Sequence, residues 1–169
     1  MDKVEKVLRD FSRRIPELRG LCYWERLQRL QMNSLQRRLE RYSLIYTWKV
    51  MSGLVPNPGL NWSPGVGRRG RMCQVPDLKG KSSVKNLRSQ SYQVAGPQLW
   101  NCLPKSIRNK SCKSLEEFKE YLDQFLTKVP DEPKADGCTP GATNHHTGKA
   151  TNSLIYQVAR RRGTWRDIL

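Results

Sequence analysis

The sequence predicts a mostly α-helical fold: a small helical assembly with a long irregular basic loop and a disordered C-terminal tail. Three observations predict it. Apolar residues recur with helical spacing in four segments, and capping or helix-breaking residues mark their ends. Residues 54–85 contain four prolines and five glycines, which interrupt regular structure. Residues 131–153 contain almost no large apolar side chains and therefore cannot form a core.

These signals also give the expected boundaries. The helical region should occupy residues 1–129, and residues 130–169 should form a mostly disordered tail. Within the helical region we expect the irregular basic loop at 54–85 and helices at about 2–15, 23–31, 34–52 and 114–128.

The first two helices are indicated by apolar residues that share one side. In the first, apolar side chains recur at i, i+3, i+4, i+7 and i+11, and Pro16 closes the pattern. They are Val4, Val7, Leu8, Phe11 and Ile15. In the second, the residues expected to face inward are Trp24, Leu27 and Leu30. Stripes of this kind ordinarily face the core.

The third helix has signals at both ends. Asn33 is expected to cap it, with Gln36 at the third helical position, and Gly53 is expected to stop it. Its main apolar stripe consists of Leu35, Leu39, Tyr42, Tyr46 and Val50. Arg37 and Arg41 lie roughly opposite, on a side that we expect to face solvent at the start of the helix. That opposite side becomes apolar at Leu44, Trp48 and Met51.

Two segments between the helices are less regular. We expect residues 54–85 to contain at most one short strand, at Arg71–Val75. Residues 86–103 carry apolar residues that could line a helix, but Gly96 and Pro97 are expected to interrupt it.

The last helix is the clearest in the chain. Ser114 and Glu117 match a capping box, and Pro130 ends the helical pattern. Its stripe consists of Leu115, Phe118, Leu122, Phe125 and Leu126. We expect Trp48 and Trp100 to be core residues, together with Trp24, because each lies in an apolar pattern. For Trp62 and Trp165, stacking on a nucleic-acid base remains open.

The charge of the chain favours a polyanionic partner. The net charge is +16 over 169 residues, and the isoelectric point is near 10.1. Residues 61–113 contain 11 basic side chains and one acidic one, Asp77, so that the positive charge is concentrated there. The length excludes a complete polymerase.

The sequence also indicates a compartment. The N-terminal residues lack the apolar region of a signal peptide, and no segment has the roughly 20 apolar residues that span a bilayer. The cysteines are odd in number and far apart, which favours a reducing compartment; they are Cys22, Cys73, Cys102, Cys112 and Cys138. We therefore expect an intracellular protein, nuclear or cytoplasmic, that is not secreted and has no membrane partner.

Several blocks of residues resemble one family. They are residues 4–27, 39–55, 95–108 and 114–123. The most specific is Leu99-Trp100-Asn101-Cys102-Leu103-Pro104, followed by Phe118-Lys119 and Leu122. From about residue 3 to 133 the chain resembles the C-terminal region of non-LTR (LINE-like, jockey-type) retrotransposon reverse transcriptases, downstream of the polymerase domain.

The resemblance implies a parent protein that carries out RNA-directed DNA synthesis, and partners that include RNA, DNA and the polymerase portion of that protein. The family's polymerase site is a paired-aspartate loop that holds two metal ions. The chain contains no Asp-Asp pair, and the family's endonuclease domain is absent. We therefore expect a fragment with no catalytic residues, no enzyme activity, no cofactor, no metal and no small-molecule substrate.

The strongest chemical signal is a run of basic residues in and after the irregular loop. Such residues could bind phosphates without base specificity, although a solvated linker is an equally good interpretation. The candidate nucleic-acid-binding residues are Arg68, Arg69, Arg71, Lys79, Lys81, Lys85 and Arg88, with Arg37 and Arg41 as a possible extension.

Two other motifs fail on their context. The run Gly65–Gly70 has the spacing of a dinucleotide-binding loop, but Pro64 precedes it where a strand is required and no helix follows. Cys138, His145 and His146 do not have the spacing of a zinc site.

Three classes of function therefore compete. The chain could be an accessory region that binds nucleic acid without sequence preference. It could be a protein-interaction scaffold whose first three helices packed on the upstream polymerase or thumb domain. It could also be a decayed element copy without function. The sequence favours the first.

Overall fold

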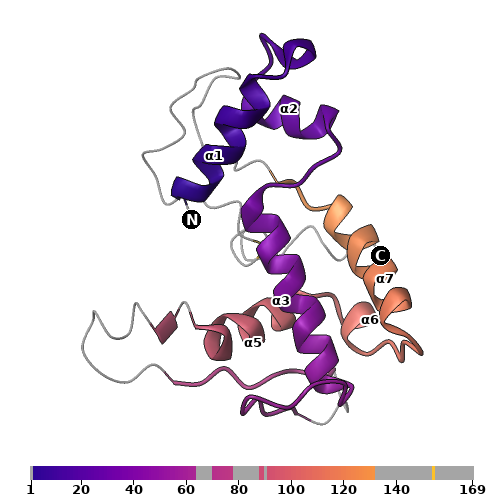
Figure 1. Cartoon of the computed structure of the whole chain (residues 1–169). Helices are drawn as coiled ribbons and strands as arrows, with labels where there is room; N and C mark the ends of the chain where they lie inside the picture. The colour runs from indigo at the N-terminus through magenta and orange to yellow at the C-terminus, as the bar shows by residue number, and fades with distance from the viewer. Residues whose placement is uncertain (1, 64–69, 78–87, 90, 132–153, 155–169) are drawn as a thin grey trace.

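The computed structural model describes residues 2–63, 70–77, 88–89, 91–131 and 154. Helices dominate this part of the chain (Figure 1). They are α1 (Asp2–Arg13), the 3-10 turn η1 (Pro16–Leu18), α2 (Tyr23–Arg29), α3 (Leu35–Met51), α5 (Tyr92–Cys102), α6 (Lys105–Arg108) and α7 (Leu115–Thr127). The mostly α-helical fold class is confirmed, and the four expected helices correspond to α1, α2, α3 and α7. The only β pairing within the described residues is an isolated antiparallel bridge between Trp62 and Cys73.

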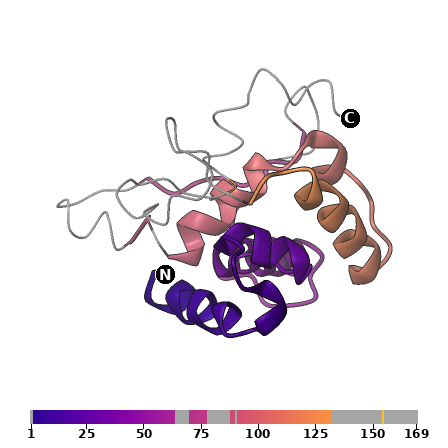
Figure 2. The same ribbon diagram turned by 90° about the horizontal axis from the view of Figure 1, so that it is seen from above.

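Helix α3 is the central element. It packs against α5 and α7, while α1 contacts its N-terminal half and α2 (Figure 1). Seen from above, α1, α2 and α3 lie together on one side of the layer formed by α5, α6 and α7 (Figure 2). One side of this group of three helices therefore faces away from α5, α6 and α7 (Figure 2).

The core lies between α3, α5, α6 and α7. Trp48 stacks on Phe118 with ring centroids 5.3 Å apart, and Trp100 lies 6.1 Å from the same Phe118 ring. These three aromatic side chains are buried, as are Leu44 and Leu122. Burying each such side chain contributes about 1.5–3 kcal/mol, so this cluster contributes substantially to stability. The expected core positions of Trp48 and Trp100 are confirmed, whereas Trp24 is only half-buried.

The helix caps are partly those expected. In α7, Ser114 Oγ accepts a hydrogen bond of 3.1 Å from the Glu117 N–H, as the capping box predicts. In α3 the cap is Ser34, not Asn33: Ser34 Oγ accepts the Arg37 N–H at 3.1 Å. Asp131 holds Ser34 in place by accepting its hydroxyl at 2.7 Å. The partner that selects Ser34 thus lies almost a hundred residues away in sequence.

The expected interruption at Gly96 and Pro97 is wrong. Helix α5 continues through both residues. Pro97 has no N–H to bond to the carbonyl group four residues earlier, a loss that ordinarily costs about 3 kcal/mol. Burial of Pro97 in the helix interface offsets it. Gly96 fits because a Cβ there would lie 2.7 Å from the ring of Tyr92, which occupies that space.

The orientation expected for α3 is wrong over its first two turns. Arg37, expected to face solvent, has only 1% of its side chain exposed, and the neighbouring Glu40 has 3%. Leu39 and Tyr42, expected to face the core, are 50% and 63% exposed. The reason is that the side of α3 bearing Leu44 packs against the core, and Arg37 lies on that side.

Helix α1 is also turned differently from its sequence pattern. Val4, Val7 and Phe11 are exposed, while the polar side of the helix faces α2 and α3. Its contacts there include two side-chain hydrogen bonds. Glu5 Oε2 accepts the Leu35 N–H at 3.0 Å, and Ser12 Oγ accepts Arg26 Nε at 3.1 Å.

Most of the expected disordered tail lies outside the described residues. Leu154 is an exception, because it is fully buried. Its backbone N–H donates to the Glu40 carboxylate at 2.9 and 3.0 Å. Leu154 is therefore part of the packed structure. Within the described ranges, no helix is long and apolar enough to cross a membrane.

Candidate nucleic-acid interface

The basic residues predicted from the sequence fall into three groups. Five of them lie outside the described residues: Arg68, Arg69, Lys79, Lys81 and Lys85. Arg71 and Arg88 are exposed. Arg37 and Arg41 are bound to acidic groups of the protein itself.

Arg37 and Arg41 are therefore poor candidates for phosphate contacts. The Arg37 guanidinium lies 3.8 Å from Glu40 and 3.7 Å from Asp131, and it donates to the Pro130 carbonyl at 3.0 Å. Arg41 makes a two-point contact with Asp123, at 2.6 and 2.7 Å. These hydrogen bonds raise the pKa of Arg41. Because acidic groups of the protein compensate the charges of Arg37 and Arg41, neither residue belongs to the candidate interface.

Asn101 anchors the basic segment to the helical core. Its side-chain amide donates to the Cys73 carbonyl at 2.8 Å and accepts the Cys73 N–H at 2.9 Å. This two-point bond satisfies both backbone groups of Cys73, which is buried. The loop is thus fixed to the C-terminal end of α5 at this point.

Arg71 is fixed by its backbone, which leaves its side chain exposed. Its N–H donates to Asn109 Oδ1 at 2.8 Å. Its carbonyl accepts Arg108 Nη1 at 3.0 Å and the indole N–H of Trp100 at 3.3 Å. Gly70 allows this approach, because a Cβ there would lie 2.6 Å from Asn109 Oδ1.

Arg108 has a structural role although it is a cation. It is buried, and it also donates through Nε to the Leu103 carbonyl at 2.9 Å. Burial lowers its pKa, but an arginine stays protonated at neutral pH. Arg108 therefore connects the start of α6 to the backbone of Arg71.

A short antiparallel pairing holds the two ends of the loop tip together. The Ser63 N–H donates to the Met72 carbonyl, and the Gln74 N–H donates to the Asn61 carbonyl, both at 2.8 Å. Arg68 and Arg69 belong to the six residues that connect Ser63 to Gly70. The two ends of the segment that contains Arg68 and Arg69 are therefore held next to each other.

Trp62 packs on the core beside this pairing. Its ring meets Trp100 edge-on, with centroids 5.6 Å apart. The Trp62 ring, for which the sequence leaves base stacking open, is therefore already in contact with a core residue.

Exposed lysines lie close in the chain to the residues that bind the Arg71 backbone. Lys105 and Lys110 lie on either side of Arg108 in the chain, and Lys113 follows before α7. Lys110 is the residue after Asn109, so it lies next to the point where the Arg71 backbone is bound. These lysines therefore lie within a few residues, in the chain, of Arg108 and Asn109, which bind the Arg71 backbone.

These lysines contribute to the net charge of residues 61–113, but the sequence pattern did not mark them as candidate binding residues. The anchoring residues Asn101, Arg108 and Asn109 were not identified as such either. Two of them had a signal: Asn101 belongs to the LWN-x-LP block and Arg108 follows it. Their role depends on contacts with residues about 30 positions away, which no local pattern reveals.

Within the described part of the chain, no group of acidic, histidine or cysteine side chains is arranged to hold a metal ion. Cys138, His145 and His146 lie outside the described residues. Comparison of the chain with protein-family models, with curated proteins and with solved structures found no match.

Proposed function

We propose that this chain is the C-terminal region of a non-LTR retrotransposon reverse transcriptase and that it binds RNA or DNA through the phosphate backbone, without sequence preference. The observation that supports it best is the anchoring of exposed Arg71 by Asn109, Arg108 and Trp100. Exposed Lys105 and Lys110 flank Arg108 and Asn109 in the chain. Side chains fixed in this way can contact phosphates with little loss of backbone entropy.

The charge distribution supports the same proposal. In residues 61–113, 11 basic side chains are accompanied by Asp77 alone. Phosphate contacts position a protein on nucleic acid but do not distinguish bases. A surface built from arginines and lysines on an irregular loop has the chemistry for this kind of binding.

The resemblance to retrotransposon proteins gains a physical interpretation. In the LWN-x-LP block, Trp100 and Leu103 are buried core residues and Asn101 binds the backbone of the basic segment. The block that identifies the resemblance therefore joins the helical core to the candidate binding loop.

The test is a salt titration of binding to unrelated single-stranded RNAs and duplex DNAs. Replacing Arg68, Arg69 and Arg71 together by glutamine should weaken binding to all of them about equally. The slope of log affinity against log salt on duplex DNA should fall by about 2 to 3, because each lost phosphate contact contributes about 0.9.

The matched control replaces three exposed basic residues in α1 and directly after it, which are Lys6, Arg13 and Arg14. This variant loses the same net charge away from the loop. If both triple variants lower the slope equally, only net charge matters and the loop is not the interface. An affinity that does not depend on salt would contradict the proposal itself.

We also propose that the chain has no polymerase or endonuclease activity of its own, because it lacks the paired aspartates that two-metal nucleotidyl transfer requires. Magnesium-dependent incorporation of nucleotides on a primed template by the purified chain would contradict this.

The exposed apolar residues favour a second function, that of an interaction scaffold. Val7 and Phe11 of α1 are 67% and 63% exposed, and Leu39 and Tyr42 of α3 are 50% and 63% exposed. Where such exposed apolar side chains form a contiguous patch, it often marks a protein interface. The resemblance suggests the polymerase portion of the parent protein as the partner.

The scaffold function can be tested separately. Val7→Gln with Phe11→Gln should abolish co-purification with that polymerase portion and leave nucleic-acid binding unchanged. Unchanged co-purification would exclude α1 as the contact.

A further inference from the structure

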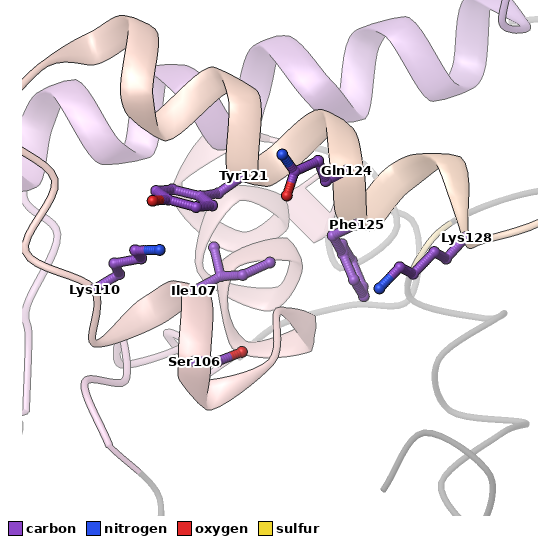
Figure 3. A pocket seen from close by; sticks show the side chains of 7 residues that line it. All are labelled: Ser106, Ile107, Lys110, Tyr121, Gln124, Phe125 and Lys128. Atoms are coloured by element: carbon purple, nitrogen blue, oxygen red, sulfur yellow. The ribbon is translucent and has the colours of Figure 1, made fainter. Parts of the chain in front are cut away.

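A small hollow lies between α6 and α7 (Figure 3). Its volume is about 200 Å³. Ile107 and Phe125 supply buried apolar carbon at its base. Lys110 and Lys128 lie at its two ends (Figure 3).

The walls of the hollow add an aromatic ring and neutral polar groups. Tyr121 contributes its ring, and Lys110 Nζ lies 3.1 Å from the centre of that ring. Ser106 and Gln124 contribute a hydroxyl and a carboxamide at the edge. The hollow thus combines apolar surface, a ring face, hydrogen-bonding groups and two cations.

This combination matches one ligand chemistry. A flat heteroaromatic ring would bury its faces against Ile107, Phe125 and Tyr121. Its polar edge could bond to Gln124, which can both donate and accept. Anionic groups on either side of the ring would meet the two lysines. A base with its two flanking phosphates has this arrangement, and the volume accommodates one base but not a base pair.

Lys110 connects the hollow to the candidate interface. It follows Asn109, which binds the backbone of Arg71. Lys110 therefore links the hollow, in sequence, to the point where the Arg71 backbone is bound. Lys110 can leave the Tyr121 ring for a phosphate, since a charge-assisted hydrogen bond to phosphate exceeds an exposed cation–π contact.

Two acidic residues of α7, Glu117 and Glu120, come shortly before Tyr121 in the chain, and Glu120 is exposed. Glu117 lies about one turn before Tyr121 on α7, and its carboxylate accepts the Lys113 N–H at 2.8 Å. That bond holds it toward the start of α7, whereas Lys128 lies beyond the other end of the helix.

We propose that this hollow accepts an unpaired base, so that the chain prefers single-stranded over duplex nucleic acid. The inference rests on the proposed nucleic-acid binding and deepens it. A base inside a duplex is stacked and paired, and it cannot enter the hollow without being displaced.

The test compares a single-stranded 12-nucleotide DNA carrying one central 2-aminopurine with the same sequence as a duplex, at fixed salt. Wild type should bind the single strand more tightly and change the fluorescence of its 2-aminopurine. Tyr121→Ala should weaken binding of the single strand about fivefold or more, the loss expected for one stacking contact. Its affinity for the duplex should stay that of wild type, and Tyr121→Phe should keep the single-strand preference.

Two matched controls replace residues of the same type elsewhere. Tyr42→Ala removes an exposed tyrosine of α3, and Lys119→Met removes a lysine that pairs with Glu116 on another side of α7. Neither should change the ratio of single-strand to duplex affinity, whereas Lys110→Met with Lys128→Met should lower the salt slope for the single strand.

The outcomes separate the two proposals. If wild type binds both probes equally, or Tyr121→Ala keeps the wild-type ratio, the hollow is not a base site and backbone binding stands. If wild type binds neither probe, the proposed function and the inference both fail.

Discussion

Asn101 shows how one side chain can connect a sequence motif to a binding surface. Its amide pairs with both backbone groups of Cys73, and no other residue type of that size offers a donor and an acceptor at the required spacing. Asparagine at this position is therefore explained by the loop that it holds.

We expect Asn101→Ala to lower the free energy of unfolding by about 1–3 kcal/mol, because it leaves the buried backbone of Cys73 without partners. Denaturant unfolding would measure the change. Asn33→Ala is the control, since α3 is capped by Ser34, and it should change stability by less than about 0.5 kcal/mol. Equal effects of the two substitutions would show that the anchor contributes nothing.

Cys73 gives a prediction about chemical reactivity. Burial raises the pKa of its thiol to about 11, so that roughly one molecule in a thousand carries the reactive thiolate at pH 8. Iodoacetamide at pH 8 should therefore modify Cys73 more slowly than the half-buried Cys22 and Cys102. The rate at Cys73 should rise with pH up to about 11. Peptide mapping by mass spectrometry would contradict this by finding Cys73 among the first residues modified.

At the scale of the element, α3 presents two apolar sides, and only one of them can face the core. The sequence stripe that begins at Leu35 is as regular as the side bearing Leu44 and Trp48. The buried side also contains Arg37 and Glu40, whose charges are compensated by each other and by Asp131. Pairing and hydrogen bonding reduce the large penalty for burying such groups.

The orientation of α3 can be tested by a pair of substitutions. Leu44→Ala should cost about 2–5 kcal/mol because it opens a cavity in the core. Leu39→Ala removes the same atoms from a position that is half exposed, and it should cost about 1 kcal/mol or less. Thermal and denaturant unfolding would both report the difference. A larger loss of stability for Leu39→Ala than for Leu44→Ala would show that the side of α3 bearing Leu39 faces the core.

Helix α5 illustrates a second effect at this scale. Its proline would break an isolated helix, yet the helix continues because Pro97 is buried among core residues. Local propensity is a weak term when tertiary packing covers the whole element.

At the scale of the whole molecule, α3 is tied to residues that follow α7. Asp131 binds Ser34, and Leu154 donates its backbone N–H to Glu40 while its side chain is buried. Chain segments far apart in sequence therefore complete the surroundings of α3.

We expect a chain that ends after residue 133 to be less stable than the full chain by about 1.5–3 kcal/mol, the value of one buried leucine. The matched variant Leu154→Ala in the full chain should reproduce most of this loss. Both can be measured by denaturant unfolding. A truncated chain as stable as the full one would show that Leu154 does not contribute to the core.

The sequence by itself determined the positions of α1, α2, α3 and α7, because periodicity and end signals act within a few residues. It also determined the core role of Trp48, Trp100 and Phe118, because each lies in an apolar pattern. These features depend on interactions that neighbouring residues make with one another.

The tertiary structure alone decided which sides of α1 and α3 are buried, that α5 continues through Pro97, and that Asn101 and Asn109 hold the basic loop. The buried side of α3 depends on Asp131, the course of α5 depends on its packing against α3, and the two asparagines bind the backbone of residues 71–73. These partners are all distant in sequence. Which side of a helix is buried depends on the free energy of the whole molecule. A charge can therefore be buried, or an apolar stripe exposed, when the total free energy is lowest that way.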